Sequence, residues 1–351
     1  MNTRNFIYSP LCSSAIAGNS SFCSPFTLNM RRCRVKNADF SNSETITTQN
    51  PQQLNFRKIT PADMPQIWSI MRREKGRTTD FSYGGLLMWV DYFHYEFAVV
   101  SDTLFIKGRV ESDVSKVAFS LPVGQLPLKE AVELLRRYCR SQNIPLIFSA
   151  VPEYALADFE ALCPISVEPL TDWADYLYDA QPLATLRGKK MSKKRNHVNQ
   201  FLAAYPDYSY QPLDPLSAAS ALAFMDHIDA EGDHTPMAET ERRLNREMLR
   251  YVEDGDPILL GGVLRDGAGH MLAFTIGDIK GDTLFIHIEK ALREVPGGFE
   301  MINKSFAEAV CANHPEIRYI NREDDAGDEG LRMAKESYHP IELLRKYNIM
   351  M

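Results

Sequence analysis

Residues 283–310 read TLFIHIEKALREVPGGFEMINKSFAEAV, and this stretch decides the fold of the chain. Its apolar first half, 283–288, predicts a buried strand. A turn containing Pro296, Gly297 and Gly298 then leads into a helix from about Phe299. Such a turn presents free backbone N–H groups at a helix N-terminus, which suits a phosphate or a carboxylate. An ordinary helix start would give the same pattern.

The next segment, IRYINREDDAGDEGLRMAKESYHP (317–340), repeats this plan. It predicts a strand at 317–320, a polar run at 321–325, a turn at Gly327 and a helix toward Ser337. Two strand-to-helix crossovers that end in polar loops are typical of an open α/β site at the ends of strands.

Composition limits the classes of protein to which the chain can belong. The 351 residues carry a formal net charge of −7 and 44% hydrophobic residues, which is ordinary for globular domains. No run of 18 apolar residues occurs, so the sequence predicts no membrane span. The acidic balance argues against nonspecific nucleic-acid binding but allows a local basic patch. The six cysteines show no Cys-x-x-Cys spacing, which predicts reduced thiols without zinc in a cytoplasmic protein.

The order of expected elements divides the chain into three parts. Residues 1–53 show no hydrophobic periodicity, and we expect a disordered extension. It reflects either a start codon placed too far upstream or a segment of transit-peptide-like composition. Residues 54–180 and 181–351 each predict a strand-helix domain. In the first domain, the turn LPVGQLP (121–127) has no ionisable group, so we expect this domain to be a scaffold.

Three motifs carry a family resemblance. HIEKA (287–291) with Gly298, Asn303 and Phe306, the run NREDDAGDEGLRMAKESYHP (321–340), and GKKMSKKRNHVNQF (188–201) resemble the phosphatidylglycerol lysyltransferase C-terminal domain family, in its stand-alone soluble branch. The resemblance covers about Leu54 to Met351. It implies a mixed α/β fold with two GNAT-type acyltransferase domains in tandem, an architecture shared with Fem-type peptidyltransferases, and it names no substrate.

The third motif is strongly basic, with six basic residues among the nine from Arg187 to Arg195. At helical spacing, Lys194 and Arg195 fall at the margins of an apolar stripe. Their side chains either extend into solvent or reach a cleft between the domains. A solvated face explains the charge; the family motif favours contact with a phosphate or RNA.

Glu289 and Lys290 lie at the end of the central strand, where a GNAT-type donor and acceptor would meet. They form either an ordinary ion pair or a site in which Glu289 holds an ammonium group or accepts its proton. Arg293, Gly297 and Gly298 partly resemble the GNAT pyrophosphate loop. The spacing departs from the usual Arg-x-x-Gly-x-Gly/Ala form, and this departure argues against coenzyme A as the ligand.

The second crossover supplies the remaining candidates. Arg322 fits a clamp for a phosphate or carboxylate, and Tyr338 lies where many GNAT enzymes place a proton donor. Tyr338 could equally be a packing residue. The candidate catalytic residues are Glu289 and Tyr338. The residues expected to bind donor or acceptor are Lys194, Arg195, Asn196, Lys290, Arg293, Gly297, Gly298, Asn303, Asn321, Arg322, Glu323 and Asp324; no metal ligands are expected.

These patterns predict an aminoacyl- or acyltransferase that joins an acyl group to an amine or hydroxyl of a small molecule or lipid head group. Catalysis would rest on positioning and on stabilising an oxyanion. Aminoacyl-tRNA is the first expected donor and acyl-CoA the second, with no tightly bound cofactor. The alternatives are an acyl-CoA-dependent N-acetyltransferase and a catalytically silent binding module.

Overall fold

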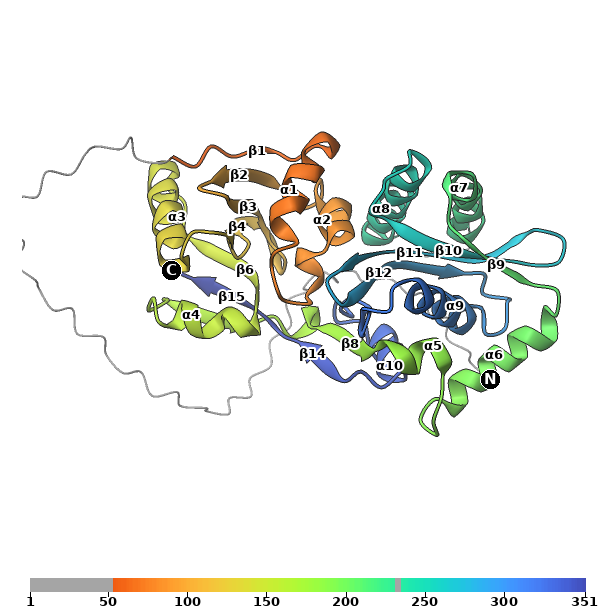
Figure 1. Cartoon of the computed structure of the whole chain (residues 1–351). Helices are drawn as coiled ribbons and strands as arrows, with labels where there is room; N and C mark the ends of the chain where they lie inside the picture. Colours follow the sequence, from red (N-terminus) through yellow and green to blue (C-terminus); the bar gives the residue numbers. More distant parts are fainter. Residues whose placement is uncertain (1–52, 231–234) are drawn as a thin grey trace, which may run out of the picture.

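The computed structural model describes residues 53–230 and 235–351, and it contains two mixed β-sheets with helices packed on them (Figure 1). The predicted extension at 1–53 lies outside the described residues apart from Gln53, so it stays a prediction.

The first sheet has the strand order β1-β2-β3-β4-β6-β15-β7, with β5 paired to β3. Its core is rich in phenylalanine, including Phe105, Phe119 and Phe148. β4 and β6 run parallel and all other neighbours are antiparallel. The strands are β1 (Arg57–Lys58), β2 (Glu96–Val100), β3 (Thr103–Val110), β4 (Asp113–Phe119), β5 (Val123–Gly124), β6 (Ile147–Pro152), β7 (Ser166–Pro169) and β15 (Lys346–Met350).

The second sheet has the order β14-β8-β13-β12-β11-β10-β9. Its two longest strands, β11 and β12, are buried along almost their whole length because helices cover both faces. The strands are β8 (Asp175–Asp179), β9 (Ser209–Pro212), β10 (Leu260–Arg265), β11 (Met271–Lys280), β12 (Thr283–Ala291), β13 (Tyr319–Asn321) and β14 (Glu342–Leu344).

Helices from both halves of the chain cover the second sheet. One apolar cluster packs Ile276 and Ile288 of the sheet against α2, α7 and α8, and the other packs Leu284 and Ile286 against α5, α6 and α9. Helix α2 belongs to the first half and stands between the two sheets (Figure 1). The helices are α1 (Met64–Met71), α2 (Tyr83–Trp89), α3 (Leu128–Gln142), α4 (Leu156–Glu160), α5 (Ala180–Thr185), α6 (Ser192–Ala204), α7 (Pro215–Ala230), α8 (Pro236–Glu253), α9 (Gly298–Asn313) and α10 (Glu329–Glu336).

The two sheets exchange strands across the boundary that we predict near residue 180. β8 precedes that boundary but pairs with β13 and β14 of the second sheet. β15, at the C-terminus, pairs with β6 and β7 of the first sheet. The two halves of the chain are thereby interlocked.

Strands β12 and β13 separate partway along their length. They pair in parallel only where Thr283–Phe285 meets Tyr319–Asn321, whereas β12 continues to Ala291. A polar opening remains between the end of β13 and the second half of β12, and it positions the candidate site. No helix in the described part of the chain is both long and apolar enough to span a membrane.

Candidate active site

A buried carboxylate near the end of β12, that of Glu289, is held by two partners from the two crossovers. Arg322, just after β13, donates from Nη2 to Oε1 of Glu289 at 3.0 Å, and Asn303 of α9 donates from Nδ2 to Oε2 at 2.9 Å. All three side chains are buried. Within the described residues, the amide oxygen of Asn303 has no hydrogen-bond partner. Buried polar atoms are usually hydrogen-bonded, so this oxygen is available to accept a hydrogen bond from a ligand.

The alternative in which Glu289 pairs with Lys290 is wrong. Successive side chains of a strand point to opposite faces, so Lys290 lies on the other side of the sheet. There its ammonium group pairs with Oε1 of Glu241 in α8 at 2.7 Å. Lys290 therefore does not join the donor-binding residues near Glu289.

An aromatic ring joins two cations beside this carboxylate. Lys194 Nζ lies 3.9 Å from the centre of the Tyr338 ring, and Arg322 Cζ lies 4.6 Å from it. Lys194 also pairs with Glu300 Oε1 at 3.2 Å. Burial lowers the pKa of Lys194, and this effect exceeds the opposing effect of Glu300. The arrangement concentrates positive charge above a desolvated ring.

A surface cleft of about 870 Å³ lies between α6, the glycine turn and α10. Its cationic lining residues are Lys190, Lys193, Lys194 and Arg293. Among the described lining residues, only Glu300 carries a carboxylate. This local excess of positive charge contrasts with the acidic chain as a whole and suits an anionic ligand.

The glycine turn closes one side of this cleft. Gly297 is left-handed (φ 70°), and a Cβ there would collide with the backbone oxygen of His197 in α6. Gly297 therefore lets the turn and α6 approach closely. The N–H of Gly298 donates to Val295 O at 3.2 Å. That N–H thus serves the turn itself rather than the expected anion.

Arg195 and Asn196 do not line the cleft. The Arg195 guanidinium donates to the backbone oxygens of Leu186 and Gly188, the latter at 2.7 Å, and so holds the segment before α6. Asn196 is exposed. Neither side chain lines this cleft with Lys194, because consecutive residues of a helix point to different faces, and their expected role in binding stays a prediction.

Asn321 and Asp324, on either side of Arg322 in the polar run, do not line the cleft. Asn321 donates to the backbone oxygen of Arg77 at 2.6 Å and to Asp175 at 2.9 Å, so it joins the two halves of the chain. Asp324 faces Lys346, with Oδ2 3.9 Å from Nζ. These residues stabilise the junction between the sheets.

Glu323 belongs to a buried triad that the motifs did not reveal. Its Oε1 lies 2.8 Å from Nδ1 of His287, whose Nε2 lies 2.8 Å from Oδ2 of Asp278. Burial by itself would lower the pKa of His287, but the hydrogen bonds to Asp278 and Glu323 outweigh it and raise the pKa to about 10. His287 is therefore an imidazolium at neutral pH.

Two cleft residues were missed from the sequence. His197 and Glu300 pair at 2.8 Å (Nδ1 to Oε1), and Glu300 also holds Lys194. Glu300 lies in the first turn of α9, where a carboxylate is favoured, and that position was the available signal. Within residues 53–230 and 235–351, no group of three or more His, Cys, Asp or Glu side chains is placed to hold a metal ion.

The two sheets, the separated β12–β13 pair and the glycine turn define a fold of two mixed α/β units in tandem. The family described as phosphatidylglycerol lysyltransferase, C-terminal, matches residues 72–350, and the chain belongs to this family.

Three solved structures share the fold of this chain. A conserved protein of unknown function from Bacteroides thetaiotaomicron is 32% identical, with a TM-score of 0.76 over 85% of this chain and 100% of that one. The L-PGS structure from Bacillus licheniformis is 14% identical and covers 86% of this chain and 94% of that one, with a TM-score of 0.58. FemX is 9% identical and covers 85% of this chain and 98% of that one, with a TM-score of 0.56. The L-PGS and FemX structures show that their fold is shared with this chain.

A curated relative covers less of the chain. The uncharacterized protein MYCGA3080 of Mycoplasmoides gallisepticum is 22% identical over 174 residues, which make up 49% of this chain and 54% of that protein. The match thus spans about half the length of that relative.

Proposed function

We propose that this protein transfers an aminoacyl group from an aminoacyl-tRNA to an amine or hydroxyl acceptor. The observation that carries the proposal is the cationic cleft, whose lining residue Lys194 contacts the ring of Tyr338. That ring also contacts Arg322 of the Glu289–Arg322–Asn303 cluster. A nucleic acid is bound mainly through its phosphates, which lysine and arginine side chains neutralise. The membership of the family and the fold shared with L-PGS and FemX support the same class of reaction.

The residues of the site have distinct proposed roles. The acceptor nitrogen or oxygen attacks the donor carbonyl carbon and forms a new C–N or C–O bond, while the ester C–O bond to the ribose breaks. Glu289 takes the proton that the acceptor loses, and Tyr338 gives a proton to the leaving ribose oxygen. Lys194 and Arg322 stabilise the developing oxyanion, because preorganised charge in a desolvated site acts strongly on the transition state.

The cleft lysines offer a direct test of donor binding. In the variant Lys190→Gln/Lys193→Gln, we expect weaker binding of aminoacyl-tRNA and a slope of log K against log salt reduced by roughly 1–2 units, because about two phosphate contacts are lost. Lys189→Gln is the matched control, since Lys189 is exposed in the same segment but does not line the cleft. Equal salt slopes in all three proteins would contradict the proposal.

Thermal unfolding distinguishes the donors. A ligand present at 100 times its Kd adds about 2.7 kcal/mol to the free energy of unfolding. We expect stabilisation by aminoacyl-tRNA in wild type and in Lys189→Gln, with a smaller effect in the double variant. Stabilisation by coenzyme A alone would instead assign the cleft to an acyl-CoA donor. Binding without transfer to any amine or hydroxyl would favour a binding module.

A further inference from the structure

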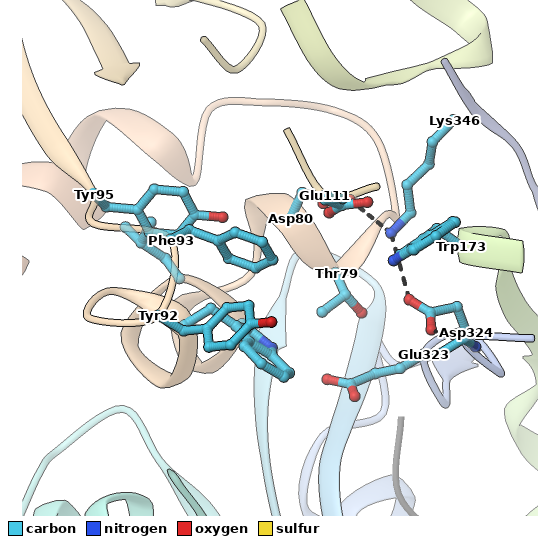
Figure 2. Close-up of a pocket in the computed structure, with 14 residues that line it drawn as sticks. Thr79, Asp80, Tyr92, Phe93, Tyr95, Glu111, Trp173, Glu323, Asp324 and Lys346 are labelled. Carbon is cyan, nitrogen blue, oxygen red and sulfur yellow. Dashed lines mark hydrogen bonds and ion pairs between the residues drawn. The ribbon is translucent and has the colours of Figure 1, made fainter. Parts of the chain in front are cut away.

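A second cavity lies at the junction of the two halves of the chain, apart from the cationic cleft. Its volume is about 60 Å³, which is enough for a few water molecules or a small ligand. The first half supplies Thr79, Trp89 and Glu111, and the second half supplies Glu323 and Lys346. Figure 2 shows Thr79, Glu111, Glu323 and Lys346 around a common space.

One wall of the cavity is aromatic. Trp89, Tyr92, Phe93 and Tyr95 come from α2 and the turn that follows it, and they pack edge to face or tilted with ring centres 4.9–5.7 Å apart. Trp173 lies on the other side, next to Lys346 and Asp324 (Figure 2). All of these rings except that of Phe93 are only partly buried. Aromatic faces attract cations.

The other wall is acidic. Asp80, Glu111, Glu323 and Asp324 line the cavity, whereas Lys346 is the single lysine or arginine among its described lining residues. Lys346 Nζ is already shared, at 3.0 Å from Asp80 and 2.9 Å from Asp175, which lies just behind. Glu323 is already paired with His287, whereas the single ammonium group of Lys346 faces three carboxylates at 2.9–3.9 Å, those of Asp80, Asp175 and Asp324.

Two further observations indicate a missing partner. Thr79 lines the cavity and is buried, with only 8% of its surface exposed. Its hydroxyl nevertheless has no hydrogen-bond partner within the described residues. Burial raises the pKa of Asp324 to about 7, with Asp175 and Glu323 acting against Lys346 and Lys335. Asp324 therefore binds a proton near neutral pH, and the positive charge of a bound cation would favour its ionised form instead.

We propose that this interdomain cavity binds a small organic cation that carries a primary ammonium group. Its N–H groups bond to Asp324 and to the Thr79 hydroxyl, and its charge lies against the rings of Trp89 and Trp173. The proposal goes beyond the transferase activity and does not depend on it, because none of these residues lines the cationic cleft.

The test is a titration with n-butylammonium chloride, with n-butanol as the neutral analogue and sodium chloride as the salt control. Two of the three tryptophans in the chain, Trp89 and Trp173, line the cavity, so tryptophan fluorescence reports occupancy directly. We expect a saturable change with n-butylammonium alone. Equal saturation by n-butanol, or no saturation by any probe up to tens of millimolar, would overturn the proposal.

Variants assign the binding to this cavity. Asp324→Asn keeps the shape of the side chain, and Trp173→Leu removes a ring; each is expected to weaken n-butylammonium binding by about tenfold or more, while Trp173→Phe retains most of it. Asp113→Asn is the matched control, because it removes a carboxylate of the first half outside the cavity. Wild-type affinity in Asp324→Asn would refute the proposed acidic wall.

The pH dependence gives an independent readout. Between pH 6 and pH 8 Asp324 ionises, so the wild-type affinity for n-butylammonium should rise. The charged and titratable groups facing Asp324 are Glu111, Asp175, Glu323, Lys335 and Lys346, and Asp324→Asn should flatten the profile. An affinity that is equally pH-dependent in wild type and Asp324→Asn would contradict the assignment.

Discussion

Glu289 shows how a single residue can serve both stability and chemistry. Its carboxylate is the acceptor for two buried donors, the guanidinium of Arg322 and the amide of Asn303. Removing one partner of a buried ion pair lowers the free energy of unfolding by more than the intact pair adds to it, because the other charge stays buried without a partner. The structure thus links the proposed proton acceptor to the integrity of the β12–β13 opening.

Glu289→Gln should therefore lower both turnover and stability. We expect turnover to fall by about 10²–10⁴-fold, and the free energy of unfolding to fall by up to about 3–5 kcal/mol because Arg322 remains charged and buried. Chemical denaturation and a transfer assay measure the two effects. In Glu289→Gln/Arg322→Gln the stability should recover while turnover stays low; recovered turnover would exclude Glu289 as proton acceptor.

His287 makes stability depend on pH. Its pKa is raised from 6.5 to about 10 in the folded protein, so its contribution is complete below about pH 6.5 and is lost as pH rises through 10. We expect the free energy of unfolding to decrease between pH 7 and pH 10. His287→Asn should be less stable at pH 7 and should lose less stability over this range. Parallel curves for the two proteins would contradict a charged His287.

At the scale of elements, the glycine turn and α6 form a single unit around the cleft. The turn approaches the α6 backbone at His197 only because Gly297 lacks a side chain and is left-handed. Lys194 and His197 of α6 both contact Glu300 in the first turn of α9. Displacing α6 would therefore disturb the cleft and the ring contact of Tyr338 together.

Gly297→Ala should separate these two elements. We expect a loss of about 1–3 kcal/mol from backbone strain, increased by the collision with His197, and weaker donor binding. Gly298→Ala is the matched control, because its Cβ would meet Val295 Cγ1 at 3.1 Å and that side chain can adjust. Thermal melts and donor titrations report both effects. An equal loss in the two variants would show that the approach to α6 is unimportant.

At the scale of the whole molecule, the two halves are joined by strands and by buried charge. β15 completes the first sheet from the C-terminus, and its first residue, Lys346, pairs with Asp80 of the first half and Asp175 of β8. Arg77 and Asp282 add a two-bond pair between the halves, at 2.8 and 3.1 Å. Lys346 and Asp80 line the interdomain cavity, so the ion pair that helps to join the two halves also forms part of the cavity wall.

Lys346→Met tests this connection. We expect a loss of about 3–5 kcal/mol, because Asp80 and Asp175 would stay buried without their shared cation. Arg345→Met is the control: Arg345 is exposed, and its surface pair with Glu153 should contribute at most about 1 kcal/mol. Urea unfolding compares the two. A small effect of Lys346→Met would show that the carboxylates accommodate the change by taking up protons.

Much of the fold could be predicted from the sequence because its signals are local. Apolar alternation and helical periodicity predicted β12 and α9, and the residues Pro296 to Gly298 predicted the turn between them. The basic segment at the start of α6 and the polar residues at the end of β13 were also recognised as candidates. Each of these signals needs only neighbouring residues, so the chain carries it without reference to tertiary structure.

The partners of those candidates were decided by tertiary structure. Glu289 pairs with Arg322 rather than with Lys290, Lys290 pairs with Glu241, and Arg195 binds backbone oxygens instead of lining the cleft. β15 likewise joins the first sheet although it ends the chain. Side-chain pairing depends on strand order and on which face of the sheet each residue occupies. Both are set by contacts between residues far apart in sequence, which local periodicity does not encode.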